Sequence, residues 1–85
     1  MAVFMIVPTS DPAKLDTAIQ QQFSSDALKL PRGEWLVKFT GTTQELSSQL
    51  NITNGESGSA VVVGILNYFG HAPTNIWEWL QSRWG

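Results

Sequence analysis

The residues Ser59–Leu66 form a continuous apolar stretch and predict a β-strand. Three consecutive valines and the pair Ile65 and Leu66 favour extended structure, and asparagine and glycine residues bound the run at both ends. Because side chains alternate along a strand, this one has two faces, made by Val61, Val63 and Ile65 and by Ala60, Val62 and Leu66. Both faces are apolar, so both need a cover.

Three further segments predict strands. Ala2–Val7 is apolar without alternation, which is typical of a central strand buried on both sides. Ala27–Leu30 and Glu34–Phe39 predict an antiparallel hairpin around a turn at residues 31–33. One face of the second hairpin strand is apolar, with Trp35, Val37 and Phe39. Its other face, with Glu34, Leu36 and Lys38, is mixed and is expected to be the open face of the sheet.

Helix signals lie between these strands. Asp11 and Pro12 offer an N-cap and a first helical residue, ahead of an apolar stripe formed by Leu15, Ala18, Ile19 and Phe23. The polar residues of this helix, Lys14, Asp16, Gln20 and Gln21, are expected in solvent. Thr42 and Glu45 fit a capping box, which predicts a second, short helix followed by a flexible loop over residues 51–58.

A last helix follows Ala72–Thr74 and is rich in tryptophan. At 100° per residue its large apolar side chains fall within an arc of about 160°. They are Ile76, Trp77, Trp79, Leu80 and Trp84. Such a stripe is more typical of packing than of a ligand platform.

The order strand, helix, strand, strand, helix, strand predicts an α+β fold, the ferredoxin-like βαββαβ two-layer sandwich, with the tryptophan-rich helix added at the C-terminal end. We expect a single domain over residues 1–85. This order places Ser59–Leu66 at an edge of the sheet, where two apolar faces without lysine or an internal proline leave it unprotected against pairing. We therefore expect a homodimer, with an interface formed by Val61, Val63, Ile65, Tyr68 and Phe69.

Composition narrows the function classes. The chain of 85 residues carries a net charge of −2, which disfavours nucleic acid as a partner. It has no cysteine, so disulfides, thiolate metal sites and cysteine nucleophiles are excluded. The apolar run at the start is too short for a signal peptide, and no run has the length of a membrane span, so a cytoplasmic protein is expected.

Several segments together resemble the small bacterial proteins catalogued as SinR-like. The most specific are Trp35-Leu36-Val37 and Trp77-Glu78-Trp79-Leu80, with the capped helix and the apolar strand between them. Those proteins look like relatives, in fold, of the CRISPR-associated structural nuclease subunit and of the virulence-associated protein D ribonucleases. The resemblance implies a ferredoxin-like homodimer and, in the nuclease branch, an aspartate at the end of the first strand that binds a divalent metal. Here Pro8 and Thr9 take that place, which argues against nuclease activity.

Candidate catalytic residues are few. Asp11 is expected to cap a helix, and the alternative interpretation makes it a metal ligand and catalytic residue assisted by Ser10 or His71. The glycine-rich segment 55–58 precedes a strand instead of following one, so it is interpreted as a loop and not as a phosphate-binding motif.

A basic cluster, Lys29, Arg32 and Lys38, lies near Trp35 and raises the possibility of a nucleic-acid contact, but Trp35 is in phase with the core.

These observations favour a non-enzymatic homodimeric domain that acts by protein–protein interaction, without a cofactor or metal. Two alternatives stay open. One is a metal-dependent endoribonuclease of the kind that the resemblance implies, and the other is a component of a toxin–antitoxin pair or an inhibitor of a larger complex.

Overall fold

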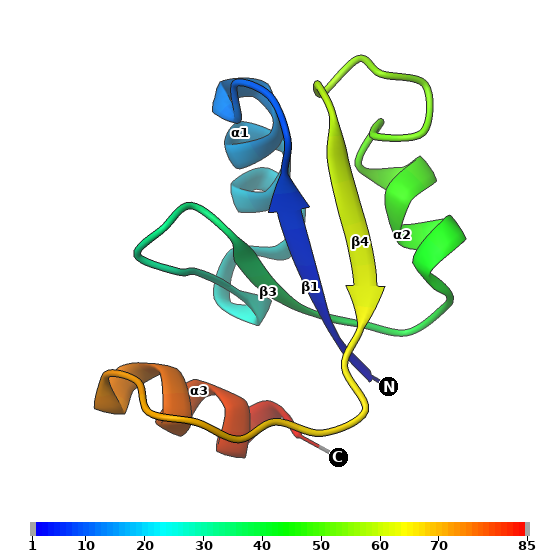
Figure 1. Cartoon of the computed structure of the whole chain (residues 1–85). Helices are drawn as coiled ribbons and strands as arrows, with labels where there is room; N and C mark the ends of the chain where they lie inside the picture. Colours follow the sequence, from blue (N-terminus) through cyan, green and yellow to red (C-terminus); the bar gives the residue numbers. More distant parts are fainter. Residues whose placement is uncertain (1, 85) are drawn as a thin grey trace.

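The computed structural model describes residues 2–84 and confirms the predicted α+β fold with βαββαβ order and a C-terminal helix (Figure 1). Four antiparallel strands form one sheet in the order β2-β3-β1-β4, as in a ferredoxin-like sandwich. The elements are β1 (Ala2–Pro8), α1 (Ala13–Phe23), the short 3₁₀ helix η1 (Ser24–Asp26), β2 (Ala27–Lys29), β3 (Trp35–Phe39), α2 (Thr43–Gln49), β4 (Ala60–Gly64) and α3 (Thr74–Arg83).

One face of the sheet packs against α1 and α2 and forms the main core. The strands contribute Trp35 and Val37 of β3, which the alternation predicted to share a face, and Phe4 and Ile6 of β1. The helices contribute Leu15, Ile19, Leu46 and Leu50. All of these side chains are buried, so most of the apolar burial that stabilises the fold lies in this layer.

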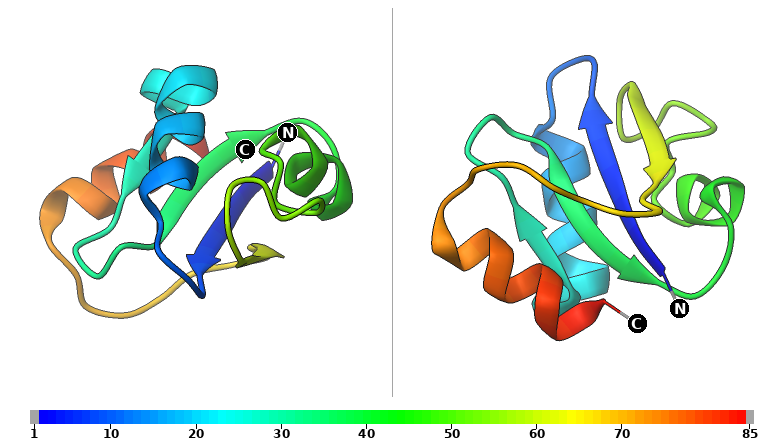
Figure 2. Two further views of the ribbon diagram at one scale, coloured as in Figure 1. Left: turned by 90° about the horizontal axis from the view of Figure 1, so that it is seen from above. Right: turned by 60° about the horizontal axis from the view of Figure 1, so that its bottom comes forward.

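The opposite face, called the front face below, carries a second, smaller core under α3. Val3 of β1 and Leu36 of β3 are buried there against Trp79 and Leu80 of the helix. The terminal helix therefore covers its own sheet, a point that the sequence left open. Figure 2 shows that α3 lies over β2 and β3, so it covers only part of the front face.

The far edge of the front face stays bare. Val61 and Val63 of β4 are 52% and 40% exposed. Leu36 lies on the face that α1 and α2 leave open, as the sequence predicted, and α3 buries it there. The open part of the sheet lies on β4 instead.

The strand β4 is shorter than the sequence predicted. It ends at Gly64, and Leu66, expected on the same face as Ala60 and Val62, is 93% exposed. The last ladder bond runs from the Ile65 N–H to the Val3 carbonyl at 3.0 Å. Beyond it the chain leaves the sheet toward α3, so alternation no longer dictates where side chains point.

Local signals predicted the start of α2 correctly and the start of α1 to within one residue. The Thr42 hydroxyl accepts from the Glu45 N–H at 3.1 Å while the Glu45 carboxylate accepts from the Thr42 N–H at 2.8 Å, which confirms the capping box. At the start of α1 the N-cap is Pro12 and not Asp11, so the helix begins one residue later than predicted, and the Asp11 carboxylate accepts from the Ala13 N–H at 3.0 Å from the position before the cap. Trp84, expected on the stripe of α3, follows the helix in extended backbone and is partly exposed.

The loop over residues 51–58 is tied to the core, unlike the flexible loop expected from its composition. Ser57 is buried, and its hydroxyl donates to the Leu50 carbonyl at 2.6 Å. The Ser57 N–H also donates to the Asn51 carbonyl at 3.0 Å. These bonds fold the loop back over the end of α2. Within residues 2–84, none of the helices has the length and apolar composition that a membrane span needs.

Candidate binding groove

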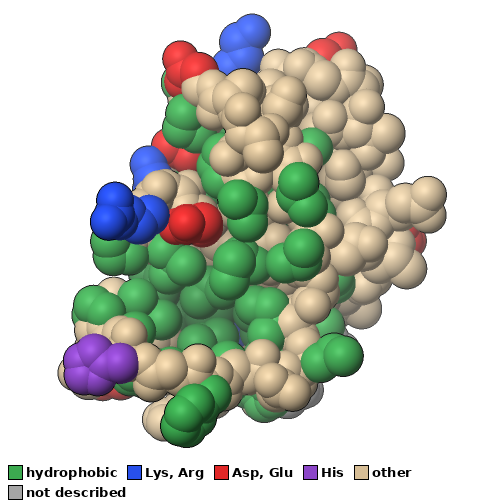
Figure 3. Space-filling model, viewed as in Figure 1, with side chains coloured by type: hydrophobic (Ala, Val, Ile, Leu, Met, Phe, Trp, Pro, Cys, Tyr) green, Lys and Arg blue, Asp and Glu red, His purple; other side chains and the backbone are tan. Residues whose placement is uncertain are grey.

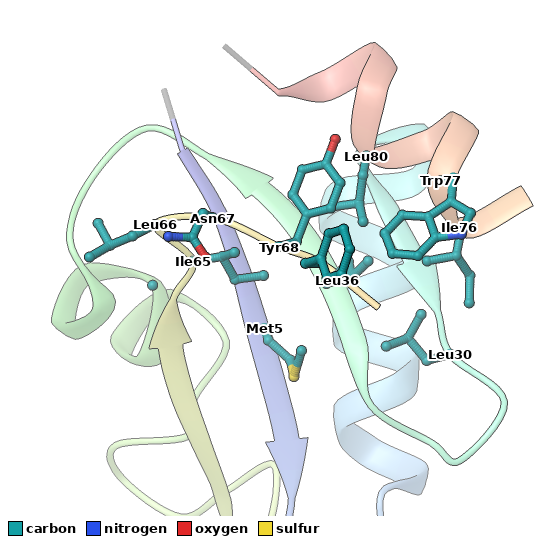
Figure 4. Close-up of a pocket in the computed structure, with 12 residues that line it drawn as sticks. Met5, Leu30, Leu36, Ile65, Leu66, Asn67, Tyr68, Ile76, Trp77 and Leu80 are labelled. Carbon is teal, nitrogen blue, oxygen red and sulfur yellow. The ribbon is translucent and has the colours of Figure 1, made fainter. Parts of the chain in front are cut away.

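An apolar groove of about 770 Å³ opens on the front face between the sheet, the connection from β4 to α3, and α3 itself (Figure 4). It is lined by Met5, Leu30, Leu36, Gly64, Ile65, Leu66, Asn67, Tyr68, Phe69, Ile76, Trp77 and Leu80. Its volume falls within the range usual for ligand pockets. Three separate parts of the chain therefore build this one site.

Aromatic contacts hold the outer wall of the groove in place. The Tyr68 ring stacks on Trp77 of α3 with the ring centroids 5.6 Å apart. It also meets the Trp84 ring edge-to-face, with those centroids 4.8 Å apart. Such pairs stabilise by about 0.5–1.5 kcal/mol beyond the area that they bury. The connection is thus anchored on α3 at Tyr68, and the residues on either side of it project outward.

Two large apolar side chains lie at the mouth of the groove in solvent. Leu66 and Phe69 have essentially no cover. The space-filling view shows apolar side chains gathered over the front of the sheet and along this connection (Figure 3). We call the exposed side chains of Val61, Val63, Leu66 and Phe69 together the front apolar surface. Contiguous exposed apolar surface of this kind marks an interaction site more often than it marks ordinary surface.

The groove offers no charged side chain. The polar side-chain groups of its lining are the amide of Asn67 and the hydroxyl of Tyr68, which can donate and accept hydrogen bonds, and the indole N–H of Trp77, which can only donate. With no acid, base or nucleophile in the lining, the groove is suited to holding uncharged apolar groups and not to acid–base chemistry.

The residues of the alternative nuclease interpretation lie elsewhere. Ser10 and Asp11 line a second, smaller hollow of about 340 Å³, together with Lys14 and Glu56. The Ser10 hydroxyl accepts from the Ser59 N–H at 2.8 Å, and the Asp11 carboxylate accepts from Ala13 at the start of α1. Both side chains therefore hold the backbone around β4 and α1.

The structure does not bring His71 to this hollow. His71 is exposed in the segment before α3, at the opposite end of the molecule from the loop between β1 and α1 (Figures 1 and 3). Among residues 2–84 there is no group of three or more histidine, aspartate or glutamate side chains that would hold a metal ion.

The basic residues near the hairpin do not form an interface with Trp35. Lys29 pairs with the Asp16 carboxylate at 2.7 Å, and the Trp35 indole N–H donates to the other oxygen of that carboxylate at 2.8 Å. The prediction that Trp35 belongs to the core is confirmed, since it is 4% exposed. The expectation that Asp16 lies in solvent is wrong, because its side chain bonds to Trp35 and is only 20% exposed.

The five residues predicted for an interface fall into two groups. Val61, Val63 and Phe69 are exposed, whereas Ile65 and Tyr68 are partly buried in the core beneath α3. Ile65 and Tyr68 are therefore partly used within the chain, although both also line the groove.

The sequence analysis did not foresee the groove itself. Met5 was assigned to a strand buried on both sides, and Leu36 to an open face. The one available signal was the apolar content of the connection after β4, where Leu66 and Phe69 are not buried in either core. No protein-family model matches the chain, and no curated protein shows significant sequence similarity to it.

Proposed function

We propose that the protein is a non-enzymatic interaction domain that binds an apolar segment of another protein in its front groove. The observation that carries the proposal is the groove of about 770 Å³, whose lining has no charged residue and whose mouth carries the exposed side chains of Leu66 and Phe69. Aromatic and aliphatic side chains that enter such a desolvated pocket supply most of the energy of an interface.

A protein segment fits this surface better than a nucleic acid does. Phosphate backbones need lysine and arginine, and none lines the groove. Asn67 and Tyr68 supply the few hydrogen bonds that orient a bound peptide, as is usual in sites of this kind.

The test is a selection of peptides from a displayed random library on the immobilised protein. We expect the selected peptides to carry aromatic or branched aliphatic residues. Their affinity should fall at least about tenfold for Leu66→Asp/Phe69→Asp, which is a loss of about 1.4 kcal/mol. Both positions are exposed, so the double variant keeps the core intact.

The matched control is Gln20→Asp/Gln21→Asp, at two exposed residues on α1 in the layer behind the sheet, which adds the same two negative charges away from the groove. Peptides that bind Leu66→Asp/Phe69→Asp as tightly as they bind the Gln20→Asp/Gln21→Asp control would show that the groove is not the binding site.

A further inference from the structure

Along β4 the backbone N–H and C=O groups of successive residues point alternately toward β1 and away from it. The bonds to β1 therefore show which residues have outward-pointing groups. The Thr9 N–H donates to the Ser59 carbonyl at 2.8 Å, and the Ile65 N–H donates to the Val3 carbonyl at 3.0 Å. In an antiparallel ladder, pairs that exchange both bonds alternate with pairs that exchange none. The residues of β4 that bond to β1 are therefore Ser59, Val61, Val63 and Ile65.

The outward groups belong to the residues in between, Ala60, Val62 and Gly64. In the sheet of residues 2–84, β4 is an edge strand, so no strand of this chain takes these N–H and C=O groups. The edge has none of the usual protection, since β4 contains no charged residue, no proline and no bulge residue.

We infer that β4 pairs antiparallel with β4 of a second copy of this chain, with Val62 of both copies at the two-fold axis. In this register Val62 faces Val62 of the partner subunit, and Ala60 faces the partner's Gly64. Every outward N–H and C=O of both strands then has a partner. The inference goes beyond the proposed groove binding and does not depend on it.

Other registers satisfy the edge less well. A shift by two residues leaves Ala60 or Gly64 opposite a residue outside the strand. A shift by one residue sets the outward groups against residues that already bond to β1. The outward set is symmetric about Val62, which is why a second copy fits this edge.

The side chains agree with the same register. Val61 comes to lie opposite the partner's Val63 in a non-hydrogen-bonded pair, where side chains approach most closely. These are the two valines that α3 leaves 52% and 40% exposed on the front face. The pairing therefore buries apolar surface that the single chain cannot cover.

Charge does not oppose the contact. The hollow between α2, its following loop and Val62 of β4 is lined by Thr43, Gln44, Ser47 and Thr53, which are all uncharged. This part of the edge therefore brings no like charges to the contact between two copies.

Single cysteines test the register on a chain that has none of its own. Opposite residues of a non-hydrogen-bonded pair suit a disulfide, whereas residues two positions out of register are about 7–8 Å apart. We expect an equal mixture of Val61→Cys and Val63→Cys chains to form a disulfide-linked dimer on oxidation. About half of the chains can do so, because only dimers with one chain of each variant place two cysteines opposite each other. Each variant alone should form little disulfide-linked dimer.

Equal cross-linking of the separate variants, or none in the mixture, overturns the register. Wild-type protein that scatters light as a monomer at micromolar concentration overturns the pairing altogether. Peptide binding in the groove is measured separately, so the failure of one proposal is distinguishable from the failure of the other.

Gly64 gives a second test that spares the fold. Its N–H points outward, and a Cβ at this position meets only the Phe4 ring at 3.8 Å, an ordinary contact. Gly64→Pro removes the outward donor from both copies and should raise the dimer dissociation constant about tenfold or more. Gly64→Ala adds the Cβ but keeps the donor, and should leave that constant nearly unchanged. A Gly64→Pro protein with native circular dichroism and unchanged dimerisation overturns the inference.

Discussion

The Asp16 carboxylate of α1 accepts a hydrogen bond from the Trp35 indole of β3 at 2.8 Å, across 19 positions of the sequence. Trp35 is buried, so this bond satisfies a donor that water does not reach. The second carboxylate oxygen accepts from Lys29 of β2 at 2.7 Å. One side chain thus links the first helix to both strands of the hairpin.

Asp16→Ala should lower the free energy of unfolding by about 1–3 kcal/mol, because it leaves the buried indole N–H without a partner. Lys29→Ala removes the more exposed half of the ion pair and should cost less, about 0–1 kcal/mol. Urea unfolding of both variants measures the difference. Equal losses would mean that the bond to Trp35 contributes nothing beyond the surface pair.

Ser57→Ala should lower the free energy of unfolding by about 1–2 kcal/mol, because the Leu50 carbonyl loses the hydroxyl that donates to it at 2.6 Å in a buried position. The comparison is Ser48→Ala, which is exposed on α2 and should change stability little. Hydrogen exchange of the amides over residues 51–58 should increase in Ser57→Ala only. Unchanged exchange there would contradict the role of Ser57 in folding the loop back.

Asp11→Ala should destabilise by about 0.5–2 kcal/mol because the Ala13 N–H at the start of α1 loses its acceptor, while Asp11→Asn, whose side-chain oxygen also accepts, should stay close to wild type. Thermal unfolding measures this. The same proteins are incubated with single-stranded and structured RNA in Mg²⁺ or Mn²⁺. Metal-dependent cleavage that Asp11→Asn abolishes would favour the ribonuclease alternative over a capping role.

Leu80→Ala should lower stability by about 2–5 kcal/mol if α3 unfolds together with the sheet, because Leu80 is buried against Val3 and Leu36. It should also speed chymotrypsin cleavage after Leu66 and Phe69, which are already exposed, because undocking of α3 frees the connection to extend into the active site of the protease. Gln81→Ala, exposed one residue further on, is the control and should show neither effect. Equal cleavage of both variants would contradict the docking of α3 through Leu80.

The elements of the fold were predictable because their signals are local. Alternation assigned Trp35 and Val37 to one face, and helical spacing assigned Leu15 and Ile19 to another, as the main core shows. The capping box of Thr42 and Glu45 lies within four consecutive residues, so no tertiary contact was needed to foresee it.

The groove was less predictable because it joins distant segments. Met5, Leu36 and Trp77 come from three elements, and no spacing in the sequence brings them together. Asp16 followed the polar pattern of its helix and was assigned to solvent, yet the position of Trp35 beneath it decided otherwise.

By itself the sequence determined the strands, the helices, their order and the two apolar faces of Ser59–Leu66, since each depends on residues a few positions apart. Only the tertiary structure decided that α3 covers its own sheet, that it stops short of Val61 and Val63, and that Ile65 and Tyr68 are half-buried in its core. The physical reason is that apolar periodicity states how much surface must be buried, whereas the path of the connection from Gly64 to Thr74 decides which surface is reached.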